Sequence, residues 1–299
     1  MLKKKNIGWW IPALLLSLPT ILLLSFPENI SFNEPETQNE TDIVNDNTLI
    51  TSPIEPTTPP TTTPTPKPLT FAQMNSLYGP CTNTPVFMYH HVQSETHAKE
   101  NKQISLTTYT ETFDAQLKYL KDKGYQTIDI GDLSGFFKGE NIIPQKPILL
   151  TFDDGYTDFY EVAYPLLKKY DYKAVLFLPT GLVNNYGYLT WPEITEMKDS
   201  GIVYFGNHTW SHYGTPKDEQ KIKTEIEIAD IQLSERGLNA FKVFAYPYGS
   251  SNLYSINTLK SLNYNLAFTT SYGITLCAKK SLELPRLRAG NLMPSYYGL

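Results

Sequence analysis

The segment that decides the fold reads Pro147-Ile148-Leu149-Leu150-Thr151-Phe152-Asp153-Asp154-Gly155. Its apolar first half is typical of a buried strand, and this strand ends in two adjacent acids and a glycine. Parallel α/β sheets place their functional side chains just beyond the carboxyl ends of the strands. We therefore expect chemistry at Asp153 and Asp154.

Strand and helix patterns alternate on both sides of this segment. The predicted strands are 86–89, 127–130, 148–152, 174–178, 202–205, 241–246 and 266–268. The predicted helices are 111–124, 158–170, 191–199, 218–236 and 255–262. Such alternation is typical of parallel βα units. It predicts an α/β fold, a distorted (β/α) barrel of about seven parallel strands that is less regular than an eightfold barrel.

Several polar residues directly follow predicted strands: His90, Asp153, Asp154, His208 and Tyr248. In a parallel sheet these strand ends share one face, so the side chains should converge. His208 and His212 lie four residues apart and can bind one metal ion from the same side of a helical turn or tight loop. One acid and two imidazoles make a three-ligand site, and the second acid is left free to act as a base. Adjacent acids can also cap a helix, and histidines can be core residues, but the convergence weighs against both alternatives.

This combination resembles the polysaccharide deacetylase family, the NodB-homology domain of carbohydrate esterase family 4, and is closest to its poly-N-acetylglucosamine deacetylase-like branch. The resemblance covers roughly residues 85–287. The first family motif is matched by 151–155, and the second, a histidine pair, by 208–212.

The resemblance implies a role for each matched residue. Asp153 would be the general base, and Asp154, His208 and His212 would hold a divalent metal. Zn²⁺ suits one carboxylate and two imidazoles, while Co²⁺, Ni²⁺ and Fe²⁺ stay open. Such an ion lowers the pKa of a bound water from near 16 towards roughly 7–9, which prepares it to attack an acetyl carbonyl.

The third family motif is matched only in part, by Ala245-Tyr246-Pro247-Tyr248-Gly249. The family's arginine, which orients the base, is Ala245 here, so another cation should replace it. The chain has three arginines, and we choose Arg286 over Arg236 and Arg288.

Two further substrate contacts are implied by the resemblance. The backbone N–H of Tyr248 would hold the oxyanion. Trp191 would form a wall of the sugar cleft, although an ordinary aromatic residue at a helix start explains it equally well.

The general acid departs from the family pattern. The family often supplies this acid as a histidine late in the domain, but none of the five histidines of this chain follows His212. His90 and His91, at the end of the first predicted strand, are the candidates, and we assign the role to His90. A purely structural role for both histidines stays open, as does proton supply by water.

The N-terminal residues 1–30 are predicted to be a membrane anchor or a signal segment. Lys3, Lys4 and Lys5 precede an uncharged run from Ile7 to Phe26 that just spans a hydrocarbon core of about 30 Å. The lysines should stay inside, which places the rest of the chain outside the cytoplasm. The length of the run, and the lack of a small-residue cleavage site, favour an uncleaved anchor over a secreted, cleaved form.

The rest of the chain is predicted to be a linker and one folded domain. Residues 31–70 are rich in Thr and Pro and should form an extended, disordered spacer. Residues 71–299 should form the deacetylase domain. Its two cysteines, Cys81 and Cys277, could pair in an oxidising compartment or stay separate thiols.

The net charge of −5 argues against a nucleic-acid partner, and we expect a monomer. The predicted function is metal-dependent hydrolysis of N-acetyl groups from an extracytoplasmic GlcNAc-containing polysaccharide, either poly-N-acetylglucosamine or peptidoglycan, with release of acetate. One alternative is an O-acetyl esterase acting on a xylan-like glycan. Another is a catalytically dead carbohydrate-binding domain.

Overall fold

The structure is a computed structural model that describes residues 67–214 and 218–299. The chain divides into two units, Met1–Thr63 and Pro64–Leu299, and the fold below is that of the second. The predicted anchor and nearly all of the predicted linker lie outside the described residues. Within the described ranges, no helix is both long enough and apolar enough to cross a bilayer.

Seven parallel strands form a closed ring. In chain order they are β2 (Val86–Tyr89), β6 (Pro147–Phe152), β7 (Ala174–Leu178), β8 (Val203–Asn207), β9 (Val243–Ala245), β10 (Leu266–Tyr272) and β12 (Leu284–Arg288). The order around the ring is β2-β12-β10-β9-β8-β7-β6, and pairing of β2 with β6 closes it. The contact between β8 and β9 is reduced to one residue pair, Asn207 with Phe244, which distorts the ring. The predicted barrel is confirmed.

Two of the strands differ from the prediction. Only β5 (Gln126–Thr127), attached to the edge of β6, exists where strand 127–130 was expected. Asp129 instead caps helix α4 (Ile130–Lys138) by a reciprocal pair of hydrogen bonds with Asp132. The seventh strand of the ring is β12, which the sequence analysis missed because a proline and two arginines interrupt its apolar pattern.

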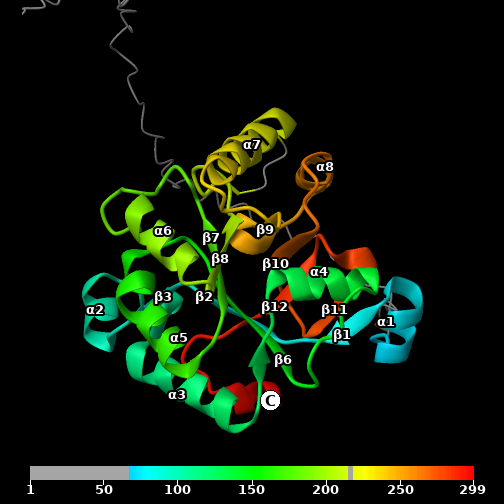
Figure 1. Cartoon of the computed structure of the whole chain (residues 1–299), viewed down its shortest axis with the longest axis horizontal. Helices are drawn as coiled ribbons and strands as arrows, with labels where there is room; N and C mark the ends of the chain where they lie inside the picture. Colours follow the sequence, from blue (N-terminus) through cyan, green and yellow to red (C-terminus); the bar gives the residue numbers. More distant parts are fainter. Residues whose placement is uncertain (1–66, 215–217) are drawn as a thin grey trace, which may run out of the picture. The chain divides into compact units, whose positions relative to one another are not determined.

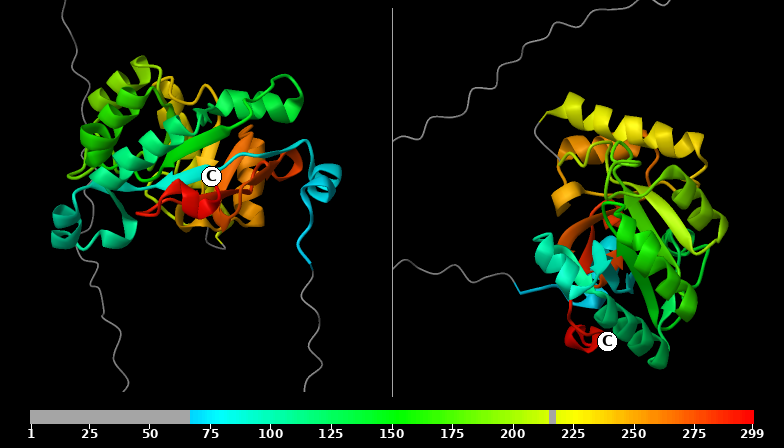
Figure 2. Two further views of the ribbon diagram at one scale, coloured as in Figure 1. Left: turned by 90° about the horizontal axis from the view of Figure 1, so that it is seen from below. Right: turned by 90° about the vertical axis from the view of Figure 1, so that its left-hand side faces the viewer.

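Helices cover the outside of the ring (Figure 1). They are α3 (Thr110–Asp122), α5 (Tyr164–Tyr170), α6 (Trp191–Asp199), α7 (Glu219–Glu235) and α8 (Leu253–Ser261), with α1 (Phe71–Tyr78) and α2 (Glu95–Glu100) beyond them. A π-helical turn, η2 (Phe159–Ala163), leads into α5. Figure 2 shows α7 alongside α8, and the C-terminal turn against α3, where the Tyr119 hydroxyl donates to the carbonyl of Leu299.

The core has two layers because strand side chains alternate between faces. On β6, Ile148, Leu150 and Phe152 pack in a cluster with residues of α3 and α5, while Leu149 belongs to a second cluster with Val175. The two-sided burial explains why this strand reads as a continuous apolar run.

Smaller elements surround the ring. β3 (His91–Gln93) pairs with β4 (Thr107–Tyr109), and β1 (Cys81–Asn83) pairs with β11 (Thr275–Cys277). Short helical turns are η1 (Ile104–Leu106), η3 (Pro247–Gly249), η4 (Ala278–Lys280) and η5 (Pro294–Tyr297). Cys81 and Cys277 form a disulfide, which decides between the two alternatives for these cysteines and joins positions 196 residues apart.

Candidate active site

The turn after β6 separates the two adjacent acids. The Asp153 N–H still donates to the Tyr89 carbonyl at 3.0 Å, but Asp154 (φ 77°) and Gly155 (φ 70°) adopt the left-handed conformation. A Cβ on residue 155 would lie 2.8 Å from Leu178 Cδ2, so glycine is needed there. Left-handed backbone at a residue other than glycine is often found at functional sites. It lets the two carboxylates take different partners.

Asp153 is held by Arg286, which comes from β12. Nη1 and Nη2 of Arg286 each donate to one carboxylate oxygen at 2.7 Å, and Nε donates to the Thr269 carbonyl at 3.0 Å. Both side chains are almost completely buried. Burial alone would raise the pKa of Asp153, but the charge and hydrogen bonds of Arg286 outweigh it and hold this pKa below its ordinary value. Asp153 is therefore ionised and held in a fixed orientation, and Arg286 stands where the sequence analysis expected the replacement cation.

Asp154 faces the two histidines instead. Its Oδ1 lies 3.4 Å from His208 Nε2 and 3.1 Å from His212 Nε2, and one ligand atom from each of the three residues lies within 4.8 Å of the others. His208 Nδ1 donates to the Ala245 carbonyl at 2.7 Å, which leaves Nε2 with its lone pair towards Asp154. Oδ1 of Asp154 is buried and accepts no hydrogen bond within the described residues. A buried acceptor without a donor, beside imidazole lone pairs, fits a divalent cation.

The histidine pair lies on a tight loop, not on a helix. Thr209 (φ 66°) and His212 (φ 59°) are both left-handed. Asn207 Oδ1 accepts from the Thr209 N–H, and the Glu225 carboxylate on α7 accepts from both the N–H and the hydroxyl of Ser211, all at 2.8 Å.

Asn207 and Glu225 therefore position the loop that carries His208 and His212 without belonging to the candidate metal site, and the sequence analysis missed both. A buried acid on the apolar side of a helix was the available signal for Glu225.

A cleft of about 470 Å³ opens over these groups. Its lining residues are His90, Leu106, Asp153, Asp154, Tyr156, His208, His212, Tyr246, Tyr248, Thr270 and Arg288. His90 thus lies beside both acids, and burial lowers its pKa below the ordinary value. His91 does not line the cleft, because its Nδ1 lies 2.9 Å from Asp158 Oδ2 and its ring stacks on Tyr156. Of the two histidines considered for the general acid, only His90 therefore lines the cleft.

Of the two remaining predicted substrate contacts, Tyr248 lies at the cleft and Trp191 does not. Tyr248 has a left-handed backbone (φ 60°), is 76% exposed, and places its ring 4.9 Å from that of His212. Trp191 begins α6 and stacks against the guanidinium of Arg236 at 3.9 Å. Trp191 is absent from the cleft lining, so the structure does not bring it to the site.

The sequence analysis also missed two polar residues of the cleft. Arg288 lies two positions after Arg286 on β12, and i and i+2 side chains of a strand share a face. Tyr156 lines the cleft together with Asp154, and burial, aided by the charge of Asp154, raises the pKa of Tyr156 well above the ordinary value. Recognising β12 as a strand would have revealed Arg288.

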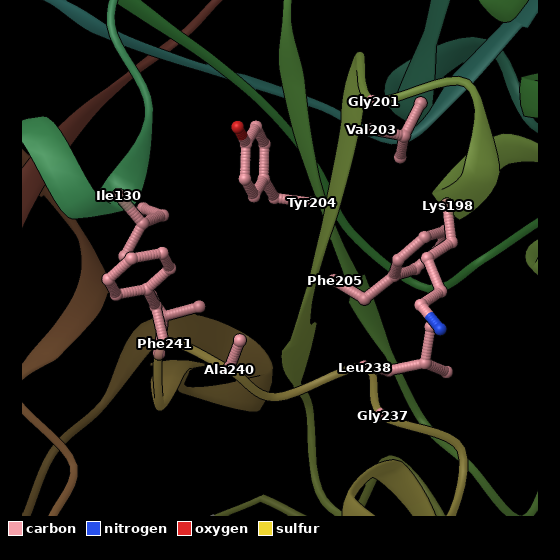
Figure 3. A pocket seen from close by; sticks show the side chains of 11 residues that line it. Ile130, Lys198, Gly201, Val203, Tyr204, Phe205, Gly237, Leu238, Ala240 and Phe241 are labelled. Atoms are coloured by element: carbon pink, nitrogen blue, oxygen red, sulfur yellow. The ribbon is translucent and has the colours of Figure 1, made fainter.

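A separate apolar cavity of about 200 Å³ lies at the opposite end of the strands (Figure 3). It is lined by Val203 and Val243, which begin β8 and β9, and by Ile130, Tyr204, Phe205, Leu238 and Phe241 among others. None of the acids or histidines described above lines this cavity. It is therefore separate from the chemistry.

The structure is a parallel barrel with a charge-paired acid and a candidate metal-binding triad at the carboxyl ends of its strands, an arrangement that suits metal-assisted hydrolysis. A family model described as polysaccharide deacetylase matches residues 141–267. The Bacillus subtilis (strain 168) protein YxkH, named for the same family, is 30% identical over 210 residues, which are 68% of this chain and 70% of that protein. The chain belongs to the polysaccharide deacetylase family, and its relatives indicate a hydrolase that acts on C–N bonds.

Two further relatives are informative. The Streptococcus pyogenes deacetylase PplD, solved in complex with acetate, is 32% identical with a TM-score of 0.65, and the match covers 72% of this chain and 96% of that one. The poly-beta-1,6-N-acetyl-D-glucosamine N-deacetylase of Escherichia coli (strain K12) is 27% identical over 247 residues, which are 68% of this chain. The match spans only 36% of the Escherichia coli protein.

Proposed function

We propose that this protein removes acetyl groups from N-acetylglucosamine units of an extracytoplasmic polysaccharide, with poly-β-1,6-N-acetylglucosamine as the first candidate and peptidoglycan as the second. The observation that carries the proposal is that the two adjacent aspartates have different partners. Asp153 is hydrogen-bonded to Arg286 and does not belong to the candidate metal site, whereas Asp154 faces His208 and His212. The similarity to the Escherichia coli enzyme supports the choice of polymer.

Asp154, His208 and His212 would hold a divalent cation, with Zn²⁺ as the first choice for this donor set. When bound, the cation supplies Lewis-acid activation of a water and of the acetyl carbonyl. Asp153 accepts the proton of the attacking water, and Arg286 keeps its carboxylate ionised and oriented. The backbone N–H of Tyr248 donates to the oxyanion.

His90 would donate the proton that the leaving amine needs. It lines the cleft beside Asp153 and Asp154, whereas His91 is occupied with Asp158. Replacement of His90 by alanine should therefore slow release of the amine, whereas replacement of His91 by alanine should not. Near-normal turnover of His90→Ala would place the acid elsewhere.

Removal of metal from the full chain should abolish acetate release, and Zn²⁺ or Co²⁺ should restore it. The expected loss is complete because the cation supplies activation that no side chain replaces. The substrates would be GlcNAc oligomers in β-1,4 and β-1,6 linkage, peptidoglycan and acetylated xylan, with acetate measured. Release from xylan alone would favour the esterase. No release with metal demonstrably bound would favour a binding-only domain.

We also propose that residues 1–30 anchor the protein in the membrane and that residues 31–70 carry the domain outside the cytoplasm. The Cys81–Cys277 disulfide supports an oxidising compartment. The full chain should appear in the membrane fraction, and a chain that lacks residues 1–30 should not. A shortened mature chain in the medium would show a cleaved signal segment instead.

A further inference from the structure

A second cavity shares a wall with the catalytic cleft. Its volume is about 330 Å³, within the usual range of about 300–1,000 Å³ for ligand sites. Tyr156 lines both spaces. His90 lines the cleft and the next residue, His91, lines the second cavity, as expected where successive residues of an extended segment face opposite sides. The two spaces are therefore neighbours across one stretch of chain.

Three segments contribute the lining of the second cavity: the chain from β3 through α2 to η1, the turn after β6 together with the start of η2, and the loop before α6. The lining residues used here are Gln93, His97, Gln103, Tyr156, Glu161 and Tyr186. Apart from Tyr156, none of these six lines the catalytic cleft. The proposed function does not use this cavity.

Contacts within the protein already hold several lining side chains of the cavity in place. Gln93 is only 6% exposed, and its Nε2 donates to Gln103 Oε1 at 3.0 Å and to Thr107 Oγ1 at 2.9 Å. The ring of His91 stacks on Tyr156 with 3.7 Å between centroids, and its Nδ1 lies 2.9 Å from Asp158 Oδ2. Such preorganisation lowers the entropy cost of binding.

The remaining polar atoms suit sugar hydroxyls. Within residues 67–214 and 218–299, Gln93 Oε1, Gln103 Nε2 and the Glu161 carboxylate have no hydrogen-bond partner in the protein. A hydroxyl both donates and accepts, so a site with amide oxygen, amide nitrogen and carboxylate matches it. Tyr186, which is fully exposed, adds a flat ring at the rim that can pack on a pyranose face.

We propose that this cavity binds the sugar unit next to the one that is deacetylated, so that the glycan chain passes over Tyr156. The inference rests on the proposed function, because it takes the catalytic cleft as the place of the reacting unit. Its consequence is a preference for oligomers over single sugars. In this proposal, the segment from β3 to η1 and the loop at Tyr186 select oligomers over single sugars. The candidate metal site does not contribute to that selection.

The test compares the unchanged full chain with Tyr186→Ala, Tyr186→Phe and Tyr296→Ala on β-1,6-linked GlcNAc oligomers of one to five units. Tyr186→Ala should raise KM for the pentamer about tenfold with kcat little changed, because truncation of an anchoring tyrosine costs affinity and not chemistry. Tyr186→Phe keeps the ring and should restore KM. Tyr296 is also exposed (71%) but lies in η5 and is absent from the cavity lining, so its replacement should change nothing.

An unchanged KM for every oligomer in Tyr186→Ala, beside an active parent chain, would overturn the subsite and leave the proposed function intact. If the parent chain released no acetate from any oligomer, the proposed function would fail by itself. The cavity would then be judged by calorimetric binding of the pentamer to the parent chain and to Tyr186→Ala. Weaker binding to the variant would support the site, and equal binding or none would overturn it.

Discussion

Replacement of Asp153 by asparagine should lower kcat by about 100- to 10,000-fold, the usual contribution of a positioned general base. Asparagine keeps the shape of the side chain and can still accept a hydrogen bond from Arg286, but its amide cannot take a proton from water. The three proposed metal ligands are unchanged, so metal content should stay at the level of the parent chain. Steady-state acetate release and elemental analysis of the same sample would measure both.

The neighbouring variant Asp154→Asn is the matched control. It changes the next residue in the same way, but it replaces a proposed ligand carboxylate, whose Oδ1 lies 3.1–3.4 Å from two imidazole nitrogens, with a neutral amide. It should therefore lose metal and activity together. Normal turnover of Asp153→Asn, or loss of metal from it, would contradict the division of roles between the two acids.

Replacement of Arg286 by methionine should destabilise the domain by about 3–5 kcal/mol at neutral pH, because it leaves Asp153 buried without its counter-ion. The side chain is 1% exposed and makes hydrogen bonds to three residues, so the loss cannot be relieved by water. Chemical unfolding of the parent and variant would measure the difference in the free energy of unfolding.

The destabilisation should depend on pH with a defined sign. In the parent protein the pKa of Asp153 is depressed, so its pairing stabilises the fold above the unfolded value of about 3.9 and the stabilisation is lost as pH falls. In the variant the pKa of Asp153 rises, because burial is no longer offset by the charge and hydrogen bonds of Arg286, and protonation then relieves the buried charge. The deficit should therefore shrink from pH 7 towards about pH 4.

Arg288→Met provides the control for this experiment. Arg288 lies on the same strand but is exposed, so its replacement should change stability by no more than about 0.5 kcal/mol. A deficit for Arg286→Met as small as that of Arg288→Met, or one that does not vary with pH, would mean that Arg286 does not stabilise the buried carboxylate.

The sequence predicted those features whose signal is local. Strand β6 is buried on both sides and reads as an apolar run, and helix α6 begins at Trp191 behind a capping box. The metal triad could be proposed because its members follow strands, and parallel strands end on one face. Strand β12 was missed because it contains Arg286. This arginine can be buried only because it pairs with Asp153, which lies 133 residues away in the chain. Helix α4 was missed because Asp129, the residue that caps it, was placed in the predicted strand 127–130.

The sequence by itself determined the barrel class and the chemical types at the strand ends, because these follow from local hydrophobic periodicity and from the residues that end each strand. Only the tertiary structure decided which arginine holds Asp153, that His90 and not His91 faces the cleft, and that Cys81 and Cys277 are bonded. Each of these depends on distances between segments that are far apart in the chain. Such distances are set by packing of the whole barrel, and no local pattern records them.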